Sequence, residues 1–246
     1  NIYKQLKKSN LSNKIKFFFK YNFKKKIFFN IISHQPDFLV SNEILKQKSN
    51  IIDVGGNVGF FSLFLYLKGK INFSFIIEPQ KHMCNSMQIL FKKFNFKEYK
   101  IINSCISNRN NKFLKLYIPK KENLIFSGRS SLIKKFNKHL DIEPLKVKNY
   151  KIDKLVNKEL NKIKKIDLIK IDVEGYEIPI LQGFRDLILK KKPIVYVEVL
   201  KINFNKFLKV VEKEFNSFSL YQIYEKKLCK YEKKYLSMHN YLIYKD

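Results

Sequence analysis

The chain has 246 residues, of which 45% are hydrophobic, and it carries a formal net charge of +29 at pH 7. This length and composition are typical of one large globular domain and exclude a disordered chain. The charge suggests a nucleic-acid binder at first sight.

The kind of basic residue argues against sequence-specific binding of nucleic acid. Only three of the 50 basic residues are Arg, and the lysines are spread through every segment. Recognition of base edges favours the paired hydrogen bonds of Arg. We therefore interpret the charge mainly as a compositional bias. An acidic partner (an anionic glycan, a membrane surface or RNA) stays open as an alternative.

The three cysteines, Cys84, Cys105 and Cys229, are odd in number and far apart. They predict neither a disulfide framework nor a zinc site, and we expect no metal. Free thiols fit the reducing cytoplasm, which is the predicted location. No apolar run reaches transmembrane length, because Lys interrupts every candidate.

Residues 1–33 are basic and aromatic, and we assign residues 1–40 to an N-terminal helical extension of a domain that covers 41–246. Phe17, Tyr21, Phe28 and Ile32 could share one helical face. Such a helix could dock on the domain, which we favour, or could lie on an anionic membrane.

A glycine-rich turn follows the first predicted strand, in the stretch Asn50-Ile-Ile-Asp-Val-Gly-Gly-Asn-Val-Gly-Phe. Asp53 ends the strand, the glycines make the turn, and residues 58–67 are apolar enough for a helix that packs on a sheet. Such a turn lets a ligand approach the backbone at the start of the helix. The pattern predicts a nucleotide-binding α/β domain.

The spacing of the glycines and a later acid indicate which nucleotide is bound. A dinucleotide fingerprint that began at Gly55 would need Gly where Asn57 and Phe60 stand. The next strand, 71–77, ends in Glu78, which is placed to accept both ribose hydroxyls. An acid for ribose without a pyrophosphate loop predicts S-adenosylmethionine. The alternative is an ordinary α/β turn followed by a surface Glu.

Periodicity and turn residues predict most of the remaining elements. We expect helices at 41–47, 81–95, 153–163 and 204–215, a helix that contains Gly183, strands at 99–107, 112–118, 146–152 and 193–199, a strand that begins at Ile166 and is stopped by Gly175, and a closing antiparallel pair at 220–224 and 241–244. The segment 120–144 shows no period, and a loop of this length is usually functional. Gly183 within a helix suggests close packing.

A second informative stretch is Ile166-Asp-Leu-Ile-Lys-Ile-Asp-Val-Glu-Gly-Tyr-Glu. It reads as a buried strand whose carboxyl end bears Lys170, Asp172 and Glu174, and the next strand ends in Glu198. Ligands of open parallel sheets bind at the carboxyl ends of the strands. These residues are therefore predicted to lie in one crevice with the glycine-rich turn.

These motifs together resemble the FkbM family of S-adenosylmethionine-dependent methyltransferases. The resemblance rests on the glycine-rich turn, on Glu78-Pro79, on Lys170-Ile-Asp-Val-Glu-Gly-Tyr-Glu177 and on Tyr196-Val-Glu198, and it runs from about residue 41 to the end. It implies a Rossmann-like class I methyltransferase fold with a seven-stranded, mostly parallel sheet and helices on both faces. The family usually has Ala at the position of Gly56.

The resemblance also implies roles for individual residues. The residues that would bind the cofactor are Asp53, Gly55, Gly56, Asn57, Gly59, Glu78 and Ser107, and those that would face the methyl group and the acceptor are Lys170, Asp172, Glu174 and Glu198. Known members are mostly O-methyltransferases of sugars, glycolipids and natural-product hydroxyls. A base must take the hydroxyl proton, and Asp172, Glu198 or His139 could serve.

We therefore expect an O-methyltransferase that acts on a small-molecule or glycan hydroxyl. Two other classes stay open. An RNA methyltransferase would use the same cofactor site and the basic surface, and a binding module could retain the fold without catalysis.

Overall fold

The computed structural model describes residues 36–121, 124–125, 127–134, 140–224, 227–232 and 240–244. The predicted extension therefore lies almost entirely outside the described residues, as does His139. Within the described ranges, none of the helices is both long enough and apolar enough to cross a lipid bilayer.

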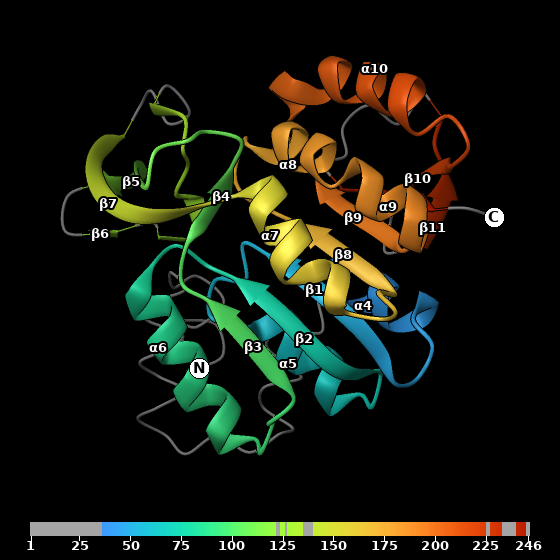
Figure 1. Cartoon of the computed structure of the whole chain (residues 1–246), viewed down its shortest axis with the longest axis horizontal. Helices are drawn as coiled ribbons and strands as arrows, with labels where there is room; N and C mark the ends of the chain where they lie inside the picture. Colours follow the sequence, from blue (N-terminus) through green and yellow to red (C-terminus); the bar gives the residue numbers. More distant parts are fainter. Residues whose placement is uncertain are drawn as a thin grey trace, which may run out of the picture.

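The core of the fold is a twisted sheet of eight strands in the order β11-β10-β12-β9-β8-β1-β2-β3 (Figure 1). Five neighbouring strands run parallel: β9 (Ile194–Glu198), β8 (Leu168–Ile171), β1 (Ser49–Val54), β2 (Ile71–Ile77) and β3 (Tyr99–Ile102). Beyond β9 the pairing is antiparallel, through β12 (Asn240–Tyr244), β10 (Ser219–Tyr224) and β11 (Lys227–Lys230). The predicted Rossmann-like fold with a mostly parallel sheet is confirmed.

The sheet corrects two details of the prediction. The predicted antiparallel pair of β10 and β12 is present, but β11 adds at the edge, so the described part of the chain forms an eight-stranded sheet where seven strands were expected. The single strand expected over 99–107 is two strands, β3 and β4 (Cys105–Ser107), which belong to different sheets. The break falls at Asn103, whose side-chain amide donates to the carbonyl oxygens of Glu78 and Pro79.

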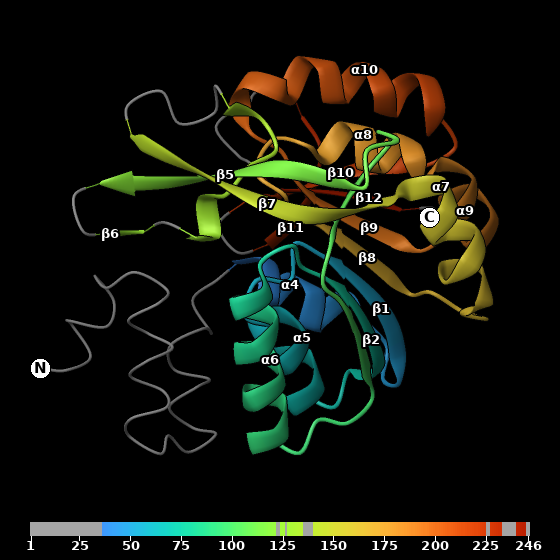
Figure 2. The ribbon, with the colours of Figure 1, turned by 60° about the vertical axis from the view of Figure 1, so that its left-hand side comes forward.

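Helices cover both faces of the sheet (Figure 2). On one face lie α4 (Pro36–Ile44), α5 (Phe60–Leu67) and α6 (Lys81–Lys93), and on the other α7 (Ile152–Lys158), α8 (Glu177–Gly183), α9 (Arg185–Lys191) and α10 (Phe204–Glu214). Each strand serves both cores, because successive side chains point to opposite faces. In β1, for example, Ile51 packs with α5 and α6, and Ile52 packs with the helices of the other face.

The first described helix begins earlier than the sequence suggested. The expected helix at 41–47 is α4, which starts at Pro36 and ends at Ile44. Val40 is only 1% exposed and belongs to the core cluster of α5 and α6. The predicted domain boundary after residue 40 therefore cuts a helix that packs in the core.

A second, four-stranded sheet stands beside the carboxyl ends of the parallel strands (Figure 2). Its order is β4-β7-β5-β6, with β7 (Asp141–Lys151), β5 (Phe113–Lys121) and β6 (Leu124–Ile125), and a short 3₁₀ helix, η1 (Ser127–Arg129), follows β6. Both long strands extend into the segment that was expected to be a loop over 120–144. Their pairing with each other, across a wide gap in sequence, outweighs the weak period of the sequence there.

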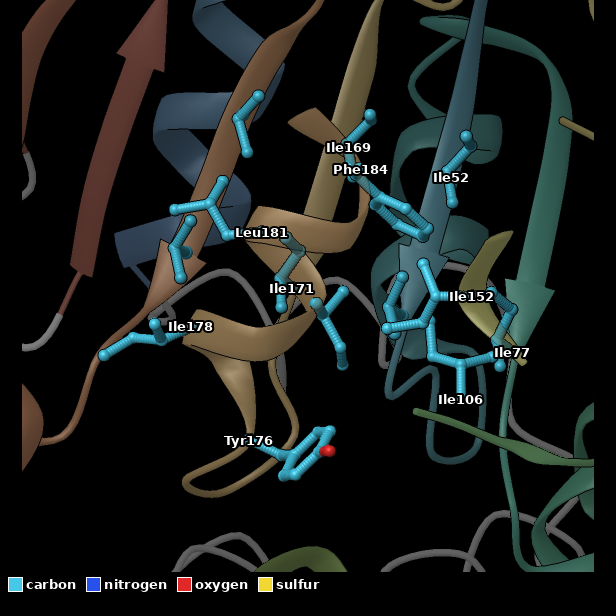
Figure 3. Packing of buried hydrophobic residues seen from close by; sticks show 14 of the residues in the cluster. Ile52, Ile77, Ile106, Ile152, Ile169, Ile171, Tyr176, Ile178, Leu181 and Phe184 are labelled. Atoms are coloured by element: carbon cyan, nitrogen blue, oxygen red, sulfur yellow. The ribbon is translucent and has the colours of Figure 1, made fainter. Parts of the chain in front are cut away.

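Gly183 lies at the end of α8, where the helix meets α7. A Cβ atom at this position would lie 2.5 Å from Cγ2 of Ile152, a residue that is itself 2% exposed. Figure 3 shows Ile152 among the buried side chains between the helices and the sheet. Close packing, which the sequence suggested, is the reason for a glycine here.

We expect Gly183→Ala to lower the free energy of unfolding by about 1–2 kcal/mol, because overpacking costs more than the better helix propensity returns. In an Ile152→Ala background the same substitution should become stabilising, since the clashing methyl group is gone. A double-mutant cycle measured by urea unfolding tests both statements. Equal effects in the two backgrounds would contradict the role of packing.

Candidate active site

The turn between β1 and α5 is held by its backbone. Gly55 and Gly59 adopt left-handed φ angles of 84° and 77°. The N–H groups of Gly55 and Gly56 both donate to the carbonyl oxygen of Ile77, at 2.9 and 3.1 Å. A Cβ atom on Gly55 would lie 1.8 Å from the backbone carbonyl oxygen of Asp172, so only glycine fits there. The turn is thus built against the acidic stretch that follows β8.

Glu78 follows β2 and is 3% exposed. Its Oε2 accepts the backbone N–H of Asn57 at 2.9 Å, and its Oε1 accepts the N–H of Gln80 at 2.8 Å. Burial raises the pKa of Glu78 to about 7, although both hydrogen bonds oppose the shift. Each carboxylate oxygen has a second lone pair, so the fixed carboxylate can still accept the hydroxyls of a diol.

Asp53 lies beneath the turn and does not face the pocket described below. It is fully buried, and its Oδ2 accepts the hydroxyl of Ser62, which is 2.8 Å from the hydroxyl of Ser74. Burial raises the pKa of Asp53, while the nearby charge of Lys170 opposes that shift. The predicted cofactor residue therefore supports the turn from the side of α5.

Lys170 is opposite Asp53 in the pairing of β1 with β8, and it is 4% exposed. Its Nζ donates to Oδ2 of Asp172 at 2.7 Å and lies 5.4 Å from the ring centre of Phe61 and 5.8 Å from that of Tyr196. A buried cation needs such partners. Lys170 thus sits between two carboxylates, inside the sheet–helix interface.

A pocket opens where the carboxyl ends of β1, β2 and β8 meet the second sheet. It has about 650 Å³ of empty space, a volume that includes its open mouth. Of the predicted site residues, Gly55, Asn57, Glu78, Asp172 and Glu174 line it.

The other predicted site residues lie outside this lining. They are Asp53, Gly56, Gly59, Ser107, Lys170 and Glu198. Ser107 is fully buried, and its hydroxyl donates to Oδ1 of Asn149 at 2.9 Å and accepts the N–H of Arg109. Its neighbours Ser104, Cys105 and Ile106 face the pocket in its place.

Several lining residues had no motif in the sequence. They are Gln80, Ser104, Cys105, Ile106, Leu116, Gly128, Ser130, Leu132 and Ile180, while Tyr176 belongs to the motif after β8 but was given no role. Three of them fall in the long segment that was singled out for its length, so this was the only available signal. Tyr176 lies beyond the end of β8 as a member of the buried cluster shown in Figure 3, and its hydroxyl donates to Oδ1 of Asn108 at 2.8 Å.

Two acids of the turn after β8 have shifted pKa values. Burial raises the pKa of Glu174 to about 7, and the nearby Asp172 and Glu177 add to the shift. Burial also raises the pKa of Glu177 to about 7, against the hydrogen bond that its Oε1 accepts from the N–H of Gly175 at 2.7 Å. Glu177 is 1% exposed, at the start of α8.

The raised pKa of Glu177 makes the stability of the fold depend on pH. A carboxyl whose pKa is higher in the folded than in the unfolded state stabilises the fold below its unfolded pKa, near 4.5, and this contribution is lost as the pH rises through about 7. The contribution of Glu177 to the free energy of unfolding falls by about 3 kcal/mol over this pH range. The free energy of unfolding should therefore decrease less between pH 4.5 and 7.5 in Glu177→Gln than in the wild type. Urea unfolding at several pH values measures this decrease. The same decrease in both proteins would contradict a raised pKa of Glu177.

The sequence and the fold were compared with known proteins. The methyltransferase FkbM domain matches residues 53–235. Methyltransferase 1 of Beauveria bassiana (strain ARSEF 2860) is 24% identical over 148 residues, which cover 56% of this chain and 59% of that protein.

Among solved structures, an FkbM methyltransferase of Methylobacillus flagellatus KT superposes with a TM-score of 0.51 at 13% identity, over 87% of this chain and 52% of that one. M. capricolum TrmK in complex with S-adenosylhomocysteine gives a TM-score of 0.46 at 15% identity, over 86% of this chain and 70% of that one. The chain thus spans less than two thirds of the length of the curated relative and of the M. flagellatus chain. Because the domain match covers most of its length, the chain belongs to the FkbM methyltransferase domain family.

Proposed function

We propose that the chain uses S-adenosylmethionine to methylate a hydroxyl group on a sugar, a glycan or a related polyol. One observation carries the proposal: a buried acid suited to a ribose diol, Glu78, lines the same pocket as two acids suited to a hydroxyl acceptor, Asp172 and Glu174. Membership of a methyltransferase family supports the same reaction class.

The residues at the ends of β1 and β2 fit the cofactor. S-adenosylmethionine, when bound, supplies a methyl group on a positively charged sulfur. The backbone at Gly55 and Asn57 would pack against the cofactor. Glu78 would accept the ribose hydroxyls through the lone pairs that are not used by its two backbone hydrogen bonds. The apolar edge made by Ile77 and Ile106 would take the adenine ring.

The lining residues that follow β8 and those from the second sheet and its neighbouring segment fit a polyol acceptor. Asp172 and Glu174 offer carboxylate oxygens to hydroxyl groups, while Leu116, Leu132 and the ring of Tyr176 offer apolar surface. A sugar presents hydroxyls at its edge and C–H groups on its faces, so it matches such a mixed wall. The same acids would repel the phosphates of RNA, which weighs against the RNA alternative at this pocket.

The cofactor assignment predicts a specific loss of affinity in Glu78→Ala. Removal of a charged hydrogen-bond partner of the ribose should weaken binding of S-adenosylhomocysteine by about 1–3 kcal/mol, and NAD should bind neither protein. Isothermal titration calorimetry measures both, with the exposed Glu98→Ala as a matched control. Thermal melting checks that the variant folds, because Asn57 and Gln80 lose their acceptor. Wild-type affinity in folded Glu78→Ala would remove Glu78 from the site.

The reaction itself is tested with S-adenosylmethionine that carries a labelled methyl group. The protein is incubated with separated glycan, small-polyol, RNA and protein fractions, and the labelled product is analysed for the atom that bears the methyl group. We expect label on oxygen in a glycan or polyol fraction. Label in the RNA fraction would favour the RNA alternative, and label on nitrogen or carbon would contradict O-methyl transfer.

A further inference from the structure

The turn that follows β8 has an unusual backbone. Glu174 has a φ of 54° and Gly175 a φ of 107°, so two successive residues adopt left-handed conformations. For a residue with a side chain such as Glu174, this conformation costs on the order of 1 kcal/mol or more and persists only where the surroundings hold it. Glu174 is one of the residues that line the pocket.

Three side chains from three separate elements hold this turn. The hydroxyl of Ser131 donates to the carbonyl oxygen of Glu174 at 2.6 Å. Oε1 of Glu177, in α8, accepts the N–H of Gly175 at 2.7 Å. The side-chain amide of Asn203, in the 3₁₀ helix η4 (Lys201–Asn203), donates to the carbonyl oxygen of Gly175 at 3.4 Å.

The Ser131 contact is itself fixed from the second sheet. Residues 117 and 131 exchange both backbone hydrogen bonds, at 2.8 and 3.1 Å, which joins this segment to β5. The neighbours of Ser131 on both sides, Ser130 and Leu132, line the pocket. The wall of the pocket and the position of Glu174 are therefore set by the same hydrogen bonds.

The other predicted acids are less suited to take a proton. Glu198 does not line the pocket. Asp172 lines it, but its Oδ2 already accepts a hydrogen bond from the ammonium group of Lys170 at 2.7 Å. Among the described acids that face the acceptor side of the pocket, Glu174 remains.

We propose that Glu174 takes the proton of the acceptor hydroxyl, and that Ser131, Glu177 and Asn203 are positioning residues that hold its turn. This inference rests on the proposed O-methyl transfer. The hydroxyl oxygen forms a bond to the methyl carbon, the carbon–sulfur bond breaks with its electron pair passing to sulfur, and the proton passes to the carboxylate of Glu174.

The charges around Glu174 suit this role. Burial, with Asp172 and Glu177, raises its pKa, and Arg129 and Lys170 act in the opposite direction, with a result of about 7. A base with a pKa near the working pH is partly ionised and still has a driving force to accept a proton. Turnover should therefore rise with pH through this range.

A measurement without any acceptor tests whether Glu174 faces the reacting sulfur. Protein labelled with ¹³C at the glutamate side-chain carboxyls is titrated by NMR with either S-adenosylmethionine or S-adenosylhomocysteine bound, and Glu174→Gln assigns the resonance. Only the first ligand carries the positive sulfur, so the pKa of Glu174 should be lower with it by about one pH unit or more. Glu159, which is half-buried, pairs with Lys100 and does not line the pocket, serves as an internal control whose pKa should not respond. The same pKa with both ligands would overturn the proposal.

Substitutions of the positioning residues should act through the same readout. In Ser131→Ala and Asn203→Ala the pKa of Glu174 should differ less between the complexes with S-adenosylmethionine and S-adenosylhomocysteine. Ser131→Thr keeps the hydroxyl group and should retain the full pKa difference. Glu177→Gln keeps an acceptor oxygen for Gly175 and should retain the difference. A full difference in both alanine variants would refute the positioning role, and melting temperatures show whether each variant is folded.

Turnover on the fraction that accepts the labelled methyl group gives the second test. Glu174→Gln should lower turnover by about 10²–10⁴-fold and remove its rise with pH, while affinity for S-adenosylhomocysteine changes little. Glu159→Gln should match the wild type in turnover.

If Asp172→Asn loses the rise of turnover with pH while Glu174→Gln keeps nearly wild-type turnover, Asp172 is the base instead of Glu174. The failure of each proposal gives a different result. A methyl group on nitrogen or carbon contradicts O-methyl transfer. An equal pKa of Glu174 with both ligands contradicts the assignment of Glu174 as the base, whichever atom carries the methyl group.

Discussion

The structure depends on the close approach of two backbones at the carboxyl end of the parallel sheet. Gly55 leaves no room for a side chain against the carbonyl group of Asp172, and the N–H of Asp172 donates to the carbonyl oxygen of Val54 at 3.0 Å. The glycine-rich turn after β1 and the acidic turn after β8 are therefore one structural unit. Because parallel strands end at the same edge of a sheet, the residues that follow them share one pocket.

Buried charge stabilises this edge only as a group. Lys170 lies between Asp53 and Asp172, with aromatic rings beside its ammonium group. Removal of one member of such a group leaves an uncompensated charge, which typically costs about 3–5 kcal/mol. The arrangement accounts for a lysine in a strand whose other side chains are apolar. Because the ammonium group also engages Asp172, the proposed proton acceptor is Glu174.

The second sheet turns an open crevice into a pocket. Leu116 and Leu132 close the side that β1, β2 and β8 leave exposed, and Ser131 fixes the turn that carries Glu174. The part of the fold that shapes the acceptor side is thus the part that also positions the proposed base. A change of acceptor in related chains would be expected to alter both together.

The sequence by itself determined the nucleotide-binding half of the fold. The strand 71–77, the turn from Asp53 to Gly59 and the acids after β8 are local patterns, since each depends on strand alternation, backbone freedom or a strand end. The close packing of Gly183 was likewise visible, because a glycine within a helix lowers stability unless a neighbouring side chain needs the room.

Only the tertiary structure decided which of these residues share a pocket. Asp53 and Lys170 lie side by side in the sheet and point to the face that α5 covers. No local sequence pattern shows that Asp53 contacts Ser62, or that Glu78 accepts the N–H of Asn57. The second sheet pairs β5 with β7 across a wide gap in sequence, so no local period announces it. The acceptor wall and the hydrogen bonds that hold Glu174 arise from contacts between segments far apart in sequence, and such contacts exist only once the chain has folded.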